Sequence, residues 1–471
     1  MPDLGSLTIT PPRVDVEAAA RPARARARVS RRFRVDLAAI AALAVVPRLL
    51  VIVSTPENAP FSDMVDYHLR AQTLLSGEAL PDSFRGPGYP AWLALFYALP
   101  IADMLAARVG NLILGAATAV ATTILAREVV GRRAAMAAGA IVALYPAGVV
   151  STAYIMPEGL YGLFTVLALI AASRSSISAA ATAGVLTGLS ALTRALGVGL
   201  LPVMGAGLAV QAWRDGRWRH AVMRAAVIGV ACLAVLAPWL WQTSRISGGP
   251  MLDSASAYNV LLGANPRARE RLDIADGNWV RATYLAGPMN EAEQNRRALE
   301  ASWEWIRSHP GRWLWLAVRK MTSLWGLEGR EHAWAYSHGY LGAHATGTVR
   351  AWGLALLFCL PPLAVAALIG LLRPGLLSTM TGVHILMILA TVTLMHGISF
   401  SETRYHLPLI PFAAVLAVRS VPGPAITRGR WLIVGLIAAA LAVGWWQQLP
   451  ELLERYAMLS TAYGWRLELP F

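Results

Sequence analysis

Lysine, cysteine and charge in general are scarce in this sequence. Lys320 is the single lysine, and the two cysteines, Cys232 and Cys359, both lie inside apolar stretches. Cysteines in such places are expected to be buried thiols, and they give no disulfide framework. Only 14% of the residues are charged, against about 25% in soluble domains, whereas 56% are hydrophobic and the mean hydropathy is +0.50. This balance indicates an integral membrane protein.

The motifs of several enzyme classes are also absent. The sequence contains no P-loop, no serine nucleophile elbow and no HExxH pair. The histidines are scattered, so a metal site is only weakly indicated; no cofactor is certain, and a divalent metal is left open. The net charge of +14 is carried by basic residues in short, separated loops. This distribution is not that of a nucleic-acid-binding face, and we expect no nucleic-acid partner.

The apolar segments predict an all-α membrane protein with about eleven transmembrane helices. The Arg-rich segment 1–36 is predicted to be a disordered cytoplasmic tail, so the first span would cross outward by the positive-inside rule. The arginines of later loops fall on the cytoplasmic side in the same arrangement. The predicted transmembrane domain covers 37–447, and 448–471 would be an outer tail. The predicted spans are 37–54, 108–127, 134–151, 157–173, 177–193, 195–212, 221–242, 350–371, 377–396, 404–419 and 431–447.

Two outer loops, 61–107 and 243–349, carry predicted interfacial helices. In the first loop, a polar helix is expected from Asp63 to Ser76 and to end at Gly77, with Asp63 and Asp66 at the end that favours negative charge. The apolar stretch 88–102 is too short for a span and is read as an interfacial or re-entrant helix. The second loop is expected to hold helices over Glu291–Ser308 and Arg312–Trp325, with a break at His309-Pro310.

Several cations break the positive-inside pattern, because they map to the outer ends of spans or to the outer loops. A charge at membrane depth costs roughly 2.5–3.5 kcal/mol on insertion scales, so it normally has a partner or a function. For Arg108 alone, snorkelling to the headgroups is the favoured interpretation. Together, however, the cations share one face with four carboxylates, which predicts a site for an anionic, lipid-embedded substrate such as a lipid phosphate. The cations are Arg48, Arg85, Arg108, Arg194, Lys320 and Arg404, and the carboxylates are Asp63, Asp66, Glu158 and Glu402.

A series of short motifs then resembles the GT-C superfamily of membrane glycosyltransferases. The chain is similar to its bacterial family 39 branch, which is related to protein O-mannosyltransferases and aminoarabinose lipid A transferases, over nearly all of 37–420. One departure stands out, since the family usually has a second acid directly after the first, where this sequence has Met64. The motifs are Asp63-x-x-x-Tyr67, Gly86-Pro87-Gly88-Tyr89-Pro90, Arg108, Tyr145-Pro146 with Pro157-Glu158, the run from Gly188 to Arg194, Gly263-Ala264-Asn265-Pro266, His309-Pro310 followed by Lys320, and Arg404-Tyr405-His406-Leu407-Pro408.

The resemblance implies an enzyme that takes a sugar from a polyprenyl-phosphate donor and transfers it, with inversion, to an acceptor hydroxyl. It implies a bacterial cytoplasmic membrane protein whose active site faces the periplasm; the sugar and the acceptor (protein, glycan or lipid) stay open. Asp63 would be the base, Asp66 could supply the displaced second acid, and Glu158 would hold a hydroxyl or orient an arginine. Arg404, Lys320 and Arg194 would bind the lipid phosphate, with Arg85, Tyr405 and His406 next. Further candidates are Tyr67, Arg48, Arg108 and Glu402.

Two other classes remain as alternatives. A polysaccharide polymerase or ligase also uses outer-face arginines and a lipid-linked glycan, but a large late loop bearing Arg and His would be expected, and 243–349 comes earlier. A secondary transporter would show repeated halves and broken helices near the midplane. Here the charges gather at one interface, which favours the glycosyltransferase.

Overall fold

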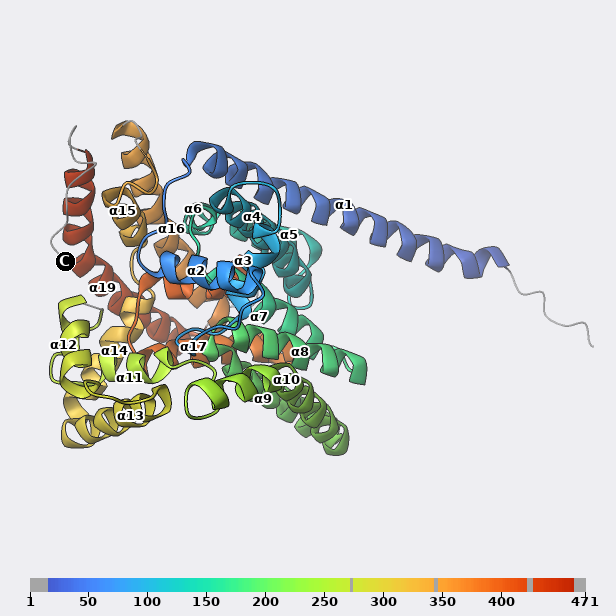
Figure 1. The fold of residues 1–471 in the computed structure, drawn as a ribbon. Helices are drawn as coiled ribbons and strands as arrows, with labels where there is room; N and C mark the ends of the chain where they lie inside the picture. Colours follow the sequence, from blue (N-terminus) through green and yellow to red (C-terminus); the bar gives the residue numbers. More distant parts are fainter. Residues whose placement is uncertain (1–15, 272–273, 343–345, 422–426, 461–471) are drawn as a thin grey trace, which may run out of the picture. The chain divides into compact units, whose positions relative to one another are not determined.

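The described part of the chain is entirely helical. The computed structural model describes residues 16–271, 274–342, 346–421 and 427–460, and these contain no β-strand. Apolar segments in hydrocarbon must satisfy their backbone hydrogen bonds internally, which a helix does. The chain divides into two units, Met1–Ala39 and Ile40–Phe471. Helix α1 (Val16–Ser54) crosses that boundary, and the other helices belong to the second unit (Figure 1).

The structure confirms a multi-pass membrane protein of the all-α class, although it does not confirm the count of eleven spans. Seven helical segments among the described residues are long and apolar enough to cross a membrane, or eight if the bent pair of α5 and α6 counts as one span. Three shorter apolar helical segments, of 15 to 17 residues, occupy the other predicted positions. The seven are Arg31–Ser54, Asp103–Arg127, Ala195–Asp215, Trp218–Ile246, Ala351–Leu372, Met380–Ile398 and Arg428–Tyr456; the three are Glu158–Ala172, Ile177–Thr193 and Thr403–Val418.

These segments are built from the following elements. They are α4 (Asp103–Arg127), α5 (Arg132–Leu144), α6 (Pro146–Val150), η1 (Ser151–Ala153), α7 (Glu158–Ala172), α8 (Ile177–Thr193), η2 (Ala195–Gly199), α9 (Leu200–Asp215), α10 (Trp218–Ile246), α16 (Thr346–Leu372), η3 (Leu376–Ser378), α17 (Met380–Ile398), η4 (Thr403–Leu409), α18 (Ile410–Val418) and α19 (Arg428–Ser460).

The helices expected in the two predicted loops are present. Helix α2 runs from Asp63 to Leu75, and Gly77 follows it with φ of +81°, a left-handed conformation that suits glycine at a helix end. Helix α13 is capped by Asn290, which forms a capping box with Glu293, and Pro310 opens the next helix. The helices outside the spans are α2 (Asp63–Leu75), α3 (Gly88–Tyr97), α11 (Ala255–Gly263), α12 (Ile274–Tyr284), α13 (Glu291–Ser308), α14 (Pro310–Leu324) and α15 (Arg330–Ser337).

The predictions for the two ends of the chain need correction. Residues 16–36 are helical rather than disordered, which the strong helix propensity of alanine and arginine explains; residues 1–15 lie outside the described residues. At the other end, α19 continues past residue 447 to Ser460, so 448–460 is not a separate tail. Leu452 is fully buried, and the Tyr456 hydroxyl donates a hydrogen bond to the Gly329 carbonyl at 3.0 Å. Residues 461–471 lie outside the described residues.

Candidate functional site

The loop between α2 and α3 lies directly against the end of α8. A Cβ atom on Gly86 would come within 2.3 Å of the Leu192 carbonyl oxygen, and one on Gly88 within 2.7 Å of the Thr193 nitrogen. Only glycine allows the two backbones to approach so closely. The Gly-Pro-Gly turn therefore brings Arg85 of the loop to the end of α8, where Arg194 is the next residue of the chain.

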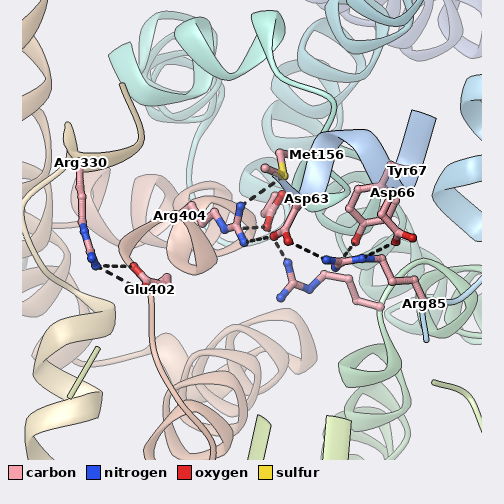
Figure 2. Close-up of polar contacts among 10 residues, drawn as sticks. Asp63, Asp66, Tyr67, Arg85, Met156, Arg330, Glu402 and Arg404 are labelled. Carbon is pink, nitrogen blue, oxygen red and sulfur yellow. Dashed lines mark hydrogen bonds and ion pairs between the residues drawn. The ribbon is translucent and has the colours of Figure 1, made fainter. Parts of the chain in front are cut away.

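The Asp63 carboxylate lies between two arginines (Figure 2). Arg85 Nη2 donates to Asp63 Oδ1 at 2.8 Å, and Arg404 Nη2 donates to Asp63 Oδ2 at 2.7 Å. Asp63 is the first residue of α2, where the helix dipole also favours a negative charge. Both carboxylate oxygens are thus engaged by cations.

Asp66 supports Arg85 from the other side. Arg85 Nε forms an ion pair with Asp66 Oδ2 at 2.8 Å, and Arg70 Nε donates to Asp66 Oδ1 at 3.0 Å. The Arg85 guanidinium also lies over the Tyr67 ring, 4.6 Å from its centroid, and donates to the Tyr67 hydroxyl at 3.1 Å. Arg70 in turn pairs with Asp82. Arg85 therefore has partners besides Asp63.

Glu158 lies between Arg404 and a third arginine, Arg194. It is the first residue of α7 and accepts a hydrogen bond from Arg194 Nη1 at 2.6 Å, while Arg404 Nε lies 3.8 Å from the same oxygen. The guanidinium groups of Arg194 and Arg404 also lie 4.4 and 5.3 Å from the centroid of the Tyr405 ring. We call Asp63, Asp66, Glu158, Arg85, Arg194 and Arg404 the arginine–carboxylate cluster.

The electrostatics of the cluster keep Asp63 ionised. Burial alone would raise the pKa of Asp63, but the positive charges of Arg404 and Arg85 outweigh it and lower the pKa to about 2. The side chain of Asp63 is 30% exposed, and those of Arg85, Arg194 and Arg404 are 17–22% exposed. The cluster is therefore shielded but accessible, and its arginines can reach an incoming anion.

A cavity of about 140 Å³ adjoins the cluster. Glu158, Arg404 and Met156 lie on its wall, and Arg404 Nη1 is 3.3 Å from the Met156 sulfur. Most of the surface of the cavity is apolar. The polar residues of its lining include Arg48, Asn111, Tyr145, Tyr154, Glu328, Glu331 and His332. Such a mostly apolar cavity with a few polar groups is typical of a small-molecule or lipid site.

His406 and Glu402 lie near the cluster in sequence but have other partners. His406 Nε2 lies 2.6 Å from Glu328 Oε1, its Nδ1 lies 2.6 Å from the Leu324 carbonyl oxygen, and its ring stacks on Trp325. Glu402 accepts hydrogen bonds from Arg330 at 3.1 and 3.3 Å (Figure 2). The phosphate-binding role predicted for His406 therefore has no support from its contacts.

The sequence reasoning missed Glu328. Its carboxylate lies on the cavity wall, is 4% exposed and accepts a hydrogen bond from the Tyr145 hydroxyl at 3.0 Å as well as facing His406. The available signal is its position in the short connection between α14 and α15, next to Gly329. That signal was weak, because nothing in the sequence pairs Glu328 with His406.

Three of the predicted cations bind backbone carbonyls instead of joining the cluster. Arg48 donates to the carbonyls of Ala44 and Ala143 at 2.8 Å each, close to the break between α5 and α6. The remaining two behave in the same way. Arg108 donates to the carbonyls of Thr55 and Pro56 at 2.8 Å each, with Glu57 at 3.4 Å, and Lys320 donates to those of Gly263 and Ile398 at 3.0 and 3.2 Å. Apart from Ala44, which lies within α1, the accepting carbonyls stand at or next to helix ends, so most of these contacts are those of helix-end caps.

The described residues offer no protein metal-binding set. In them, no three His, Cys, Asp or Glu side chains come together in a way that could hold a metal ion. The two acids of the first turn of α2, Asp63 and Asp66, are paired with arginines.

Fold and site together define a multi-pass, all-α membrane protein with charged residues gathered beside a mostly apolar cavity. No family model and no curated protein matches its sequence. Among solved structures, it is similar to ArnT from Cupriavidus metallidurans bound to undecaprenyl phosphate, with a TM-score of 0.47 at 16% identity. It is also similar to the archaeal oligosaccharyltransferase AglB from Archaeoglobus fulgidus, in complex with an inhibitory peptide and a dolichol-phosphate, with a TM-score of 0.47 at 13% identity.

Both proteins are GT-C superfamily glycosyltransferases, the superfamily that the sequence resembles. The matches cover 85% and 92% of this chain, which spans 63% of the length of ArnT and 56% of that of AglB. At these TM-scores and identities the similarity carries no conclusion about activity, so the function rests on the residues of the cluster and the cavity.

Proposed function

We propose that this protein is a membrane glycosyltransferase that moves a sugar from a polyprenyl-phosphate donor to an acceptor hydroxyl. The observation that carries the proposal is the arginine–carboxylate cluster beside a mostly apolar cavity. Arginine is well suited to bind a phosphate, because its planar donors match the phosphate oxygens. The apolar surface suits the prenyl chain, and the carboxylate can take up a proton.

The chemistry needs one proton acceptor and several fixed cations. The acceptor oxygen forms a bond to the anomeric carbon, the bond from that carbon to the phosphate oxygen breaks, and its electron pair leaves with the phosphate. The hydroxyl proton goes to Asp63. Arg85, Arg194 and Arg404 stabilise the negative charge that develops on the phosphate. Direct displacement with a single carboxylate base inverts the anomeric carbon.

In the resting arrangement Asp63 is a poor base, because its two arginine partners hold its pKa at about 2. A phosphate that draws Arg85 or Arg404 toward itself frees one carboxylate oxygen and raises the pKa of Asp63. Arg85 can make this change while Asp66 and Tyr67 still hold it. The donor therefore binds first and activates the base for the acceptor.

The positive-inside pattern supports a site on the periplasmic face of a bacterial cytoplasmic membrane. Arg217 and Glu300 are both exposed and would lie on opposite sides. In a variant without Cys232 and Cys359, an impermeant thiol reagent should label Glu300→Cys in intact cells and leave Arg217→Cys unlabelled. The reverse pattern would place the site on the cytoplasmic face.

The lipids that copurify with the protein test the activity even while the sugar is unidentified. Mass spectrometry should find polyprenyl phosphate on the wild type and, on Asp63→Asn, the sugar-bearing donor that this variant cannot use. The mass of that lipid would identify the sugar. Preparations of both proteins that carry phospholipids and no polyprenyl phosphate in either form would contradict the proposal.

A further inference from the structure

Outside the cluster, one carboxylate accepts an unusual number of hydrogen bonds. Glu291 Oε2 accepts from the Ser83 nitrogen and hydroxyl at 2.9 Å each and from the Ser247 hydroxyl at 2.5 Å. Glu291 Oε1 accepts from the Ser254 hydroxyl at 2.6 Å. Four donor groups of three serines, from the α2–α3 and α10–α11 connections, thus converge on one side chain, which is the first residue of α13.

These contacts fix the loop that carries Arg85. Ser83 is fully buried and lies two residues before Arg85, and its carbonyl accepts a hydrogen bond from the Ser254 nitrogen at 2.9 Å. The neighbouring Asp82 accepts from the Phe84 nitrogen at 2.8 Å. On its other side the loop is held by the close approach of Gly86 to Leu192. The backbone on both sides of Arg85 is therefore anchored.

We propose that Glu291 is a positioning residue that sets the place of Arg85 in the phosphate site. The inference rests on the proposed function, and it assigns a role to a residue of the second outer loop that has no contact with the cluster itself. Through Ser83, helix α13 holds the Arg85 loop at the distance at which its guanidinium meets Asp63. The backbone that carries Arg85 is thus held rigidly by the hydrogen bonds of Glu291 rather than forming a free loop.

The four hydrogen bonds to Glu291 require an ionised carboxyl group. The hydrogen bonds from Ser247, Ser254 and Ser83 outweigh the effect of burial and lower the pKa of Glu291, so it is a carboxylate at neutral pH. A glutamine in its place keeps the shape but offers a donor NH₂ group where one oxygen now accepts. At least one serine hydroxyl then loses the oxygen that accepts its proton, and the remaining bonds lose their charge-assisted strength, which destabilises the loop.

The test uses Glu291→Gln with Glu293→Gln as a matched control. Glu293 is on the same helix, is exposed and belongs only to the capping box, in which glutamine also functions. We expect Glu291→Gln to weaken binding of undecaprenyl phosphate about tenfold, by loss of a contact worth about 1.4 kcal/mol. The control should bind like the wild type.

Combination with Arg85→Ala separates positioning from general stability. If Glu291 acts through Arg85, Glu291→Gln adds nothing to the binding loss of Arg85→Ala, whereas independent effects add. Additive losses, or unchanged binding by Glu291→Gln, would overturn the inference. If Glu291→Gln does not fold, Ser254→Ala, which removes one of the four hydrogen bonds, takes its place in the same cycle. Unchanged binding by Arg85→Ala itself would instead count against the proposed function.

Discussion

The molecule contains two kinds of shielded cation, and their partners distinguish them. Arg85, Arg194 and Arg404 pair with carboxylates and keep 17–22% of their side-chain surface exposed. The second kind, Arg48, Arg108 and Lys320, is at most 2% exposed and donates to backbone carbonyls. The sequence pattern that selected them, a positive charge at the outer membrane boundary, is the same for both.

The difference indicates what each kind can do. A cation whose donors are taken up by backbone carbonyls holds helices together, and those donors are already engaged. A cation that is paired with a carboxylate and partly exposed can exchange that partner for a phosphate oxygen. We therefore propose ligand binding for the carboxylate-paired arginines and structural roles for the carbonyl-bound cations.

The largest expected effect is that of Asp63→Asn, which removes the proton acceptor and keeps the size of the side chain. Turnover should fall by about 10²–10⁴-fold, whereas the affinity for undecaprenyl phosphate should stay the same or rise, because Arg85 and Arg404 lose a competing anion. Steady-state kinetics and lipid binding measure the two effects. Asp66→Asn, as the control, should lose less turnover. Loss of turnover in Asp66→Asn with near wild-type turnover in Asp63→Asn would invert the assignment.

The next largest effect is the loss of phosphate binding in Arg404→Gln, with Arg108→Met as the comparison. Arg404→Gln should weaken phosphate binding by about 1.5–3 kcal/mol, the usual worth of a hydrogen bond to a charged group, which is about 10–150-fold in Kd. Arg108→Met should lower the melting temperature and leave the Kd unchanged, because Arg108 caps the end of α1. Equal binding losses in the two variants would remove the distinction between the two kinds of cation.

The smallest effect concerns Lys320 and appears in the pH dependence of stability. Burial lowers the pKa of Lys320 to about 7 from its ordinary value of 10.5. Between these values the unfolded chain binds more protons than the folded one, so the free energy of unfolding should rise as the pH increases from 7 to 10.5. In Lys320→Met that rise should be smaller, with donor affinity unchanged. A loss of donor affinity in this variant would restore the phosphate-binding role predicted from the sequence.

Much of the cluster could be predicted because membrane topology restricts where charges lie. Asp63, Arg85, Glu158, Arg194 and Arg404 come from five segments, and the alternation of spans alone places all five on one face. The structure then brings them together. The helices around them were predictable too, since Asn290, Pro310 and Gly77 are strong local signals for helix ends.

The rest depends on tertiary packing, which the sequence does not reveal. Lys320 and Arg404 are both cations that the sequence places at the outer boundary, and only the fold shows that one meets carbonyls and the other Asp63. His406 follows Arg404 by two residues but faces Glu328. The serines around Glu291 are common residues in unrelated segments, so no pattern could have joined them.

The central claim is that the arginines of the cluster bind a lipid phosphate, and the most direct test compares undecaprenyl phosphate with undecaprenol. The two lipids share the prenyl chain and differ in the phosphate. The wild type should bind undecaprenyl phosphate at least about tenfold more tightly, by the worth of one charge-assisted hydrogen bond, and Arg404→Gln should lose most of that preference. Equal affinities of the wild type for the two lipids would contradict the account.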